Sequence, residues 1–318
     1  MAAENKSVPP EAAPDWRAEA SALWRQLPQR GLFFGLLAVW VVFFQFLGNS
    51  TLGYVNTASL FGWFKWVQTV SDEESHTWFI PFVVAALMWW KRAELMAVPK
   101  QIWWPALGLF VVALLLHVVG FMVQQTRISF AAFFIGIYAL SGLVWGWKWW
   151  QATFFPFFLF AFAMPLGNTA EVVTVPLRML ATKLAVFTSH TVLGINVIQQ
   201  GASIISPTGK YQYEVVAACS GIRSLTAILA LSTIFSFVMF KSNWRRAAMI
   251  GAAVPLAVAG NVLRLMTIII AAEAVDAKAG NYVHENTWFS LIPYVPAIIG
   301  LLLLGRWLEE KKEVVPKP

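Results

Sequence analysis

The chain has 318 residues, of which 58% are hydrophobic and 12% are charged, and its mean hydropathy is +0.64. This composition excludes an ordinary soluble domain and is typical of a membrane protein. The net charge of +7 does not indicate nucleic-acid binding, because the basic residues separate apolar runs and form no stripe with stacking aromatics. The single cysteine excludes an intrachain disulfide, and no cluster of cysteine and histidine predicts a metal site or a cofactor.

Residues 1–30 are polar and predict a cytoplasmic tail, because the apolar run that follows begins too late for a cleavable signal peptide. A membrane span needs about 20 apolar residues, so the sequence predicts an all-α polytopic membrane protein with about eight transmembrane helices. These spans are expected at residues 31–48, 78–90, 102–123, 128–146, 150–166, 215–240, 247–272 and 288–305. The membrane domain then covers residues 31–306, residues 307–318 form a second cytoplasmic tail, and residues 52–70 are compatible with an interfacial helix.

The distribution of charges predicts the orientation of these spans. Lysine and arginine favour the cytoplasmic side of a membrane, and most of the 23 such residues fall on that side if both termini are cytoplasmic. Acidic residues collect on the opposite side, as Asp72, Glu171 and Glu285 illustrate. The prediction is therefore an N-in, C-in topology.

The longest segment between spans, residues 167–214, is then extracytoplasmic. Within it, residues 175–187 carry apolar side chains every three or four positions, which predicts an amphipathic helix lying on the outer face. Residues 194–212 alternate in polarity and contain turn signals at Gly201 and at residues 207–209, so they predict a short hairpin.

Three chemically important side chains fall on this outer side. Cys219 lies in the outer end of the sixth span, Arg264 lies in the outer half of the seventh, and His284 precedes the eighth. A thiolate is a strong nucleophile, and a nearby cation or helix N-terminus lowers the pKa of its thiol. A histidine can accept the thiol proton, and an arginine can stabilise the oxyanion of a tetrahedral intermediate.

Neighbouring residues can support this chemistry. Ser220 is placed to cap the first turn after the cysteine, and Asn261 shares a helix face with Arg264 at a spacing of three residues. Arg223 has three possible roles, because it can bind substrate, pair with Glu214 or contact a lipid headgroup.

Simpler roles for these three side chains are also compatible with the sequence. A lone cysteine is usually a packing residue, and a buried arginine can serve only to bind helix-end carbonyls. His76 and His190 are rival bases on the outer side, and His117 is expected to be a contact inside the helix bundle. The depth of Arg264 is also a difficulty, because helical side chains lean toward the helix N-terminus, which is the cytoplasmic end here.

The sequence resembles the exosortase and archaeosortase family of membrane cysteine transpeptidases. The resemblance lies in the motif ACSGIRS at residues 218–224, in the motif NVLR at residues 261–264, and in His284 before the last span. It extends to Ser75 and His76 before the second span and to residues 194–201 upstream of the cysteine. The combination of motifs is more specific than any one of them.

This resemblance implies that Cys219 is the nucleophile, Arg264 an essential cation and His284 the base, as in the bacterial branch of the family. It implies a substrate with a C-terminal sorting signal, which consists of a motif such as Pro-Glu-Pro, a hydrophobic span and a basic tail. Cleavage would occur on the periplasmic face of a bacterial inner membrane through a thioester, which an unknown acceptor or water then resolves.

Two other functions compete with this reading. One is a transporter or scaffold in which Arg264 binds an anion, and the other is a membrane acyltransferase that uses Cys219 on lipid.

Overall fold

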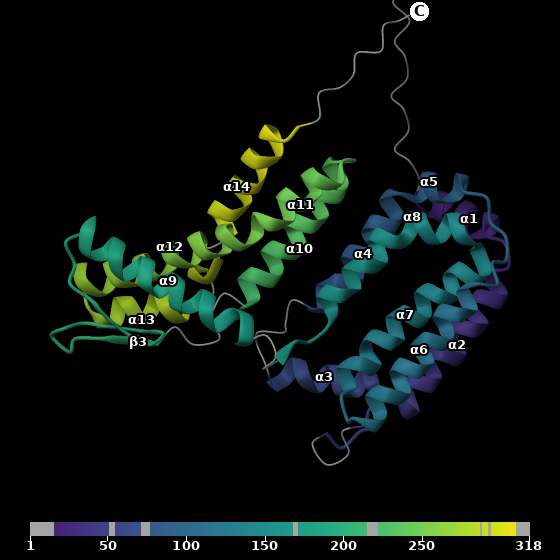
Figure 1. The fold of residues 1–318 in the computed structure, drawn as a ribbon, viewed down its shortest axis with the longest axis horizontal. Helices are drawn as coiled ribbons and strands as arrows, with labels where there is room; N and C mark the ends of the chain where they lie inside the picture. Colours follow the sequence, from purple (N-terminus) through teal and green to yellow (C-terminus); the bar gives the residue numbers. More distant parts are fainter. Residues whose placement is uncertain are drawn as a thin grey trace, which may run out of the picture.

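A computed structural model describes residues 16–50, 55–70, 77–167, 171–214, 222–286, 288–291 and 294–309 of the chain. Helices dominate these residues, as predicted, and the described strands form one small antiparallel sheet (Figure 1). The helices are α1 (Trp16–Gln26), α2 (Arg30–Leu47), α3 (Leu60–Val70), α4 (Ile80–Trp90), α5 (Arg92–Ala97), α6 (Ala106–Met122), α7 (Thr126–Trp145), α8 (Trp147–Phe158), α9 (Glu171–Thr191), α10 (Ile222–Met239), α11 (Asn243–Gly251), α12 (Ala253–Ala274), α13 (Ala277–Glu285) and α14 (Tyr294–Trp307). Short 3₁₀ helices cover Leu159–Ala163 and Phe289–Leu291, and the strands are β1 (Ile198–Gln200), β2 (Ser203–Ile205) and β3 (Gln212–Glu214).

The helices that could cross a membrane do not all coincide with the predicted spans, because α9 lies in the segment that was predicted to be extracytoplasmic. Four described helical stretches are long and apolar enough to cross a membrane, namely α2, α7, α9 and the continuous stretch Asn243–Ala274 formed by α11 and α12. Four apolar helices are shorter, at Thr77–Trp90, Ala106–Met122, Leu225–Met239 and Tyr294–Trp307. The predicted fifth span at 150–166 differs most, because α8 ends at Phe158 and a 3₁₀ turn follows.

The N-terminal half, α1 to α8, is an aromatic-rich bundle. Trp40 on α2 packs over Gly136 on α7, where an added Cβ would lie 2.3 Å from the indole ring. The indole nitrogen of Trp40 donates to the Phe133 carbonyl at 3.0 Å, which satisfies a polar group inside an apolar core. His117 lies buried in this half and its Nδ1 is 3.0 Å from Ser129 Oγ, so it is a bundle contact as expected.

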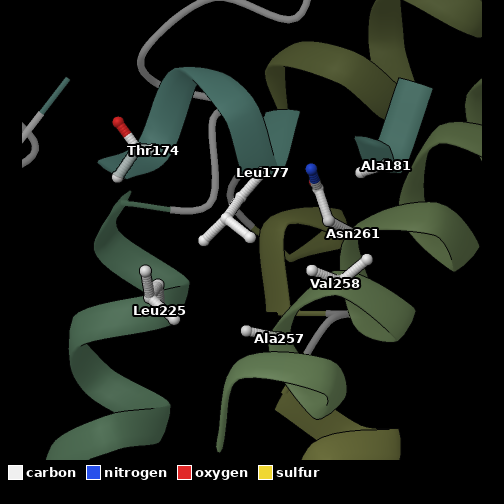
Figure 2. Close-up of a pocket in the computed structure, with 7 residues that line it drawn as sticks. All are labelled: Thr174, Leu177, Ala181, Leu225, Ala257, Val258 and Asn261. Atoms are coloured by element: carbon white, nitrogen blue, oxygen red, sulfur yellow. The ribbon is translucent and has the colours of Figure 1, made fainter. Parts of the chain in front are cut away.

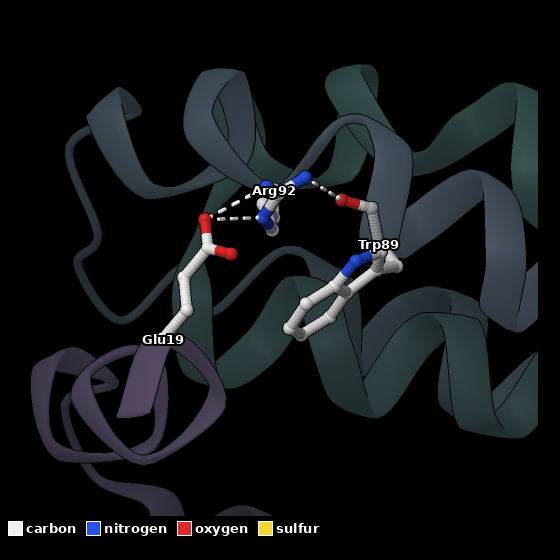
Figure 3. A network of polar contacts seen from close by, with 3 residues as sticks. All are labelled: Glu19, Trp89 and Arg92. Carbon is white, nitrogen blue, oxygen red and sulfur yellow. Dashed lines mark hydrogen bonds and ion pairs between the residues drawn. The ribbon is translucent and has the colours of Figure 1, made fainter. Parts of the chain in front are cut away.

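A polar cluster contributes to holding helix α1 against this bundle (Figure 3). Arg92 donates from Nε to Glu19 at 2.8 Å and from Nη1 to the Trp89 carbonyl at 3.1 Å. The Arg92 guanidinium also lies 4.8 Å from the centre of the Trp89 ring, a cation–π distance. These contacts hold α1 against the corner between α4 and α5.

In the C-terminal half, α10 runs antiparallel to the continuous stretch of α11 and α12. Ser232 donates to the Met249 carbonyl, Ile228 shares a buried cluster with Ala253 and Ala257, and Leu225 lies beside Ala257. Helix α14 packs on the same helices through Ala297 and Leu301. The ring of Phe237 stacks on Phe155 at 4.2 Å and joins the two halves.

The second half of α12 extends past the described start of α10 and is surrounded by α9, the sheet and α13 (Figure 1). The sheet has the order β1-β2-β3, with turns at Gly201 and Gly209, whose φ angles are 62° and 69°. The predicted hairpin is therefore confirmed, and a third strand pairs with it. The expectation of an all-α fold is wrong for residues 198–214, which contain this sheet. Glycine is needed at these two turns because other residues disfavour positive φ.

Helix α9 confirms the helical periodicity predicted for residues 175–187. Its buried positions recur every three or four residues, and most of them carry small or polar side chains. They are Thr174, Arg178, Ala181, Thr182, Ala185 and Ser189. Its large apolar residues, such as Val172 and Phe187, are exposed. The helix therefore turns its polar side to the protein and its apolar side outward, as lipid-contacting helices do.

Candidate active site

The structure brings Arg264 and His284 together. Arg264 lies on α12 with 7% of its surface exposed, and its Nη2 donates to the backbone carbonyl of His284 at 3.3 Å. The contact arises because α13 folds back along α12. Arg264 lies ten residues, or about 15 Å, before the end of α12, and the nine residues of α13 return about 13 Å. Asp276 fixes the start of α13 by accepting from the backbone nitrogen of Ala279 at 2.7 Å.

The imidazole of His284 lies against Tyr213 of β3. The two rings stack with centroids 5.9 Å apart and an interplanar angle of 25°. The Tyr213 hydroxyl donates to the Ala277 carbonyl at 3.3 Å, and burial together with the charge of Asp276 raises the pKa of this phenol. Tyr213 therefore stays a neutral platform that positions the half-buried imidazole.

A second tyrosine, Tyr211, links the sheet to the end of α12 by a hydrogen bond. Tyr211 donates to Glu273 Oε1 at 2.9 Å, and Lys210 Nζ lies 4.0 Å from Glu273 Oε2. Burial raises the pKa of Tyr211, and the hydrogen bond to Glu273 and its negative charge add to the shift. The tyrosine thus remains a donor, and the carboxylate holds β3 in the position from which Tyr213 reaches His284.

A small pocket lies where α9, the first turn of α10 and the middle of α12 meet (Figure 2). Asn261, with 5% of its surface exposed, extends from α12 into this pocket toward α9. The other lining residues are Thr174, Leu177, Ala181, Leu225, Ala257 and Val258. The space is about 20 Å³, enough for one water molecule. Asn261 of the predicted pair therefore lies at the junction of three helices, and Arg264 follows it by three residues on α12.

The remaining predicted residues are only partly covered by the structure. Cys219, Ser220 and His76 lie outside the described residues, and Arg223 is the second residue of α10 with no described side chain. The rival base His190 is exposed at the end of α9. Within the described part of the chain, no group of histidine, cysteine, aspartate and glutamate is arranged to hold a metal ion.

Residues 63–299 match the family described as transmembrane exosortase (Exosortase_EpsH), and this stretch includes α12, α13 and the pocket. The chain belongs to the transmembrane exosortase family. Exosortases are generally cysteine-type transpeptidases that act on sorting signals in the membrane. No curated protein and no solved structure matches this chain.

Two features of this exosortase site were missed in the sequence. Tyr213 carries no chemical signal of its own, because its role depends on the return of α13 toward β3. Arg178 had no role assigned from the sequence, yet the structure buries it in the face of α9 that packs inward. A signal for Arg178 was present, since it falls on the same helical face as Thr174 and Thr182.

Proposed function

We propose that this exosortase is a cysteine endopeptidase or transpeptidase that cleaves C-terminal sorting signals of exported proteins, with Cys219 as nucleophile, His284 as base and Arg264 as oxyanion-binding cation. The enzyme acts on the periplasmic face of the bacterial inner membrane, on substrates that are themselves anchored in the bilayer by an apolar helix.

The helical register between α10 and α12 is the observation that carries this proposal. Leu225 on α10 and Val258 on α12 line the same pocket, and the two helices are antiparallel. Each step backward along α10 therefore corresponds to a step forward along α12. Cys219 precedes Leu225 by six residues, and Arg264 follows Val258 by six residues. Cys219 itself lies outside the described residues, three positions before α10 begins, and the proposal places its thiol at the level of Arg264 by continuing this register.

The state of Arg264 supports its assigned role. Its Nη2 is bonded to the His284 carbonyl, whereas its buried Nε has no hydrogen-bond partner in the described part of the structure. A buried donor without a partner costs about 1–3 kcal/mol. A substrate carbonyl, and more strongly the oxyanion formed from it, would supply the missing acceptor.

The reaction then proceeds in two transfers. His284 takes the proton of the Cys219 thiol, and the thiolate attacks the peptide carbonyl to form a tetrahedral oxyanion that Arg264 stabilises. Collapse breaks the C–N bond, and His284 returns the proton to the leaving amine, which leaves a thioester on Cys219. An acceptor nucleophile or water attacks the thioester, gives up its own proton, and regenerates the thiol.

The same proposal includes the topology. Residues 1–30 and 307–318 form cytoplasmic tails, and residues 31–306 form a membrane domain with about eight spans, N-in and C-in. In Figure 1, helix α1 and the end of α14 both lie toward the upper side of the view, whereas the sheet and α13 lie lower, at the left end of the long axis. This arrangement supports an outer location for the segment 167–214 and for His284.

A reporter fused to a sorting signal of Pro-Glu-Pro, a hydrophobic span and a basic tail tests the function in cells. We expect Cys219→Ala to abolish processing and uncut reporter to accumulate in the membrane. His284→Ala should lower the rate by roughly 10²–10⁴-fold, and His190→Ala, which removes the exposed histidine of α9, is the matched control. Hydroxylamine should release a thioester-linked fragment from the wild type only.

Normal processing by Cys219→Ala would refute the enzyme proposal and favour the transporter or scaffold reading. Labelling of Cys219 by a lipid acyl donor, without cleavage of the reporter, would identify an acyltransferase instead.

A further inference from the structure

Arg178 is a second buried arginine next to the pocket. It lies on the inward face of α9 with 9% of its surface exposed, and within the described part of the chain its buried Nε has no hydrogen-bond partner. Its Nη2 contacts the neutral hydroxyl of Thr174 at 3.5 Å. Among the described residues no carboxylate lies within 4.0 Å of its guanidinium.

Such an arrangement is unfavourable without a ligand. Arginine stays protonated at all physiological pH values, and a buried charge normally has a charged partner and full hydrogen bonding. Arg178 has neither among the residues that the structure describes, although exposed positions on the same helix, such as Lys183, would accept a cation at little cost. The Nε of Arg264, on the neighbouring helix, likewise has no hydrogen-bond acceptor among the described residues. Two buried cations with unfilled donors indicate a site for an anion.

The surroundings of Arg178 connect it to the pocket. Thr174, its hydrogen-bond partner, lines the pocket, and Asn261 points into the pocket from the opposite helix (Figure 2). A guanidinium and a carboxamide are both suited to bind a carboxylate. The space of about 20 Å³ favours one small planar group over the headgroup of a phospholipid. Leu177 and Leu225 provide apolar walls that exclude water from such a contact.

We infer that Arg178 and Asn261 form a subsite that binds the carboxylate of an acidic residue in the substrate peptide. This inference rests on the proposed function and deepens it, because it assigns recognition of the signal to α9 and the pocket, and leaves bond cleavage to Cys219, Arg264 and His284. The subsite also explains why the polar side of α9 faces inward.

A crossed comparison of enzyme and substrate tests the subsite. Reporters carrying Pro-Glu-Pro and Pro-Gln-Pro are cleaved by wild type, Arg178→Gln, Arg178→Lys and the matched control Lys183→Gln. Loss of a charge-assisted hydrogen bond corresponds to roughly a 10- to 100-fold change. We expect Arg178→Gln to raise KM by that factor for the acidic reporter, and to leave the amide reporter nearly unchanged.

Arg178→Lys should keep part of the preference for the acidic reporter, whereas Lys183→Gln should keep all of it. An equal loss on both reporters would show that Arg178 only supports the fold, and would overturn the inference.

A binding measurement separates this inference from the proposed function. The purified Cys219→Ala protein is heated with acetyl-Pro-Glu-Pro-amide or acetyl-Pro-Gln-Pro-amide, and its Tm is recorded. We expect the acidic peptide to raise Tm and the amide peptide to do so much less, and Arg178→Gln to remove the difference.

This result would support the subsite even if no reporter were cleaved. Equal Tm shifts with both peptides would overturn it. A Tm shift that depends on Arg178 and appears only with phosphatidylglycerol vesicles would also overturn it, by identifying a lipid site.

Discussion

Gly280 on α13 offers the sharpest test of how the fold positions His284. A Cβ added at this residue would lie 2.0 Å from the Tyr213 hydroxyl and 2.9 Å from the Ala272 Cβ. Both distances are too short, and Ala272 is part of a helix that cannot yield locally. Gly280→Ala must therefore move α13 away from α12 and β3, and this movement separates the His284 carbonyl from Arg264.

The magnitude follows from two opposing effects. Overpacking of a filled site costs about 1–3 kcal/mol, while replacing glycine by alanine inside a helix contributes about 1 kcal/mol in favour of folding. Because both neighbours of the new methyl group lie below 3.0 Å, the upper part of the range applies. We expect a net destabilisation of about 1–2 kcal/mol and a larger loss of reporter processing, since the site moves with α13.

Thermal unfolding of the purified protein and processing of the reporter in cells measure the two effects. Gly35→Ala on α2 is the matched control, because no atom lies within 4 Å of its added Cβ. Tyr213→Phe removes the hydroxyl that makes the closest contact, so it should restore part of the stability of Gly280→Ala. If Gly280→Ala is as stable and as active as Gly35→Ala, α13 does not pack on α12 as described.

Two further changes test the supports of the site and of the N-terminal helix. Tyr211→Phe removes the bond to Glu273, and we expect a loss of about 1.5 kcal/mol in the free energy of unfolding, measured by thermal unfolding; Tyr282→Phe, on an exposed ring, should change nothing. Arg92→Gln should lower stability by less than about 1 kcal/mol, because Arg92 and Glu19 are both partly exposed. It should speed proteolysis of α1 without changing reporter processing, and an unchanged cleavage rate of α1 would show that another contact holds this helix.

The general helical organisation was predictable because its cause is local. Long apolar runs such as residues 31–48 form helices wherever the backbone must satisfy its own hydrogen bonds, and α2 follows this prediction closely. The turns at Gly201 and Gly209 were predictable for a similar reason, because their positive φ angles favour glycine and this preference is local. The third strand was not predictable in this way, because β3 is fixed by its pairing with β2 and by the bond from Tyr211 to Glu273.

The side of α9 that is buried could not be predicted from the sequence. The spacing of its apolar residues predicted a helix with two unlike sides, and the structure has such a helix. Spacing alone does not say which side meets the protein. In a membrane the apolar side of a helix can face lipid, so Arg178 and Thr182 are free to face inward. The spacing of apolar residues therefore did not predict that Arg178 is buried.

The depth of Arg264 was the main difficulty of the sequence interpretation, because an arginine in the middle of a span leans toward the cytoplasm. Two contacts between neighbouring helices bear on this difficulty. Leu225, in the first turn of α10, lies level with Ala257 and Val258, so Arg264 lies beyond that turn, in the second half of α12. Helix α13 then returns along α12 and brings the His284 carbonyl to the guanidinium. Arg264 therefore does not need to extend toward the C-terminal end of α12 to meet the segment that carries His284. The position of the site therefore depends on the length of α12 and the return of α13, and neither property can be read from the motif NVLR itself.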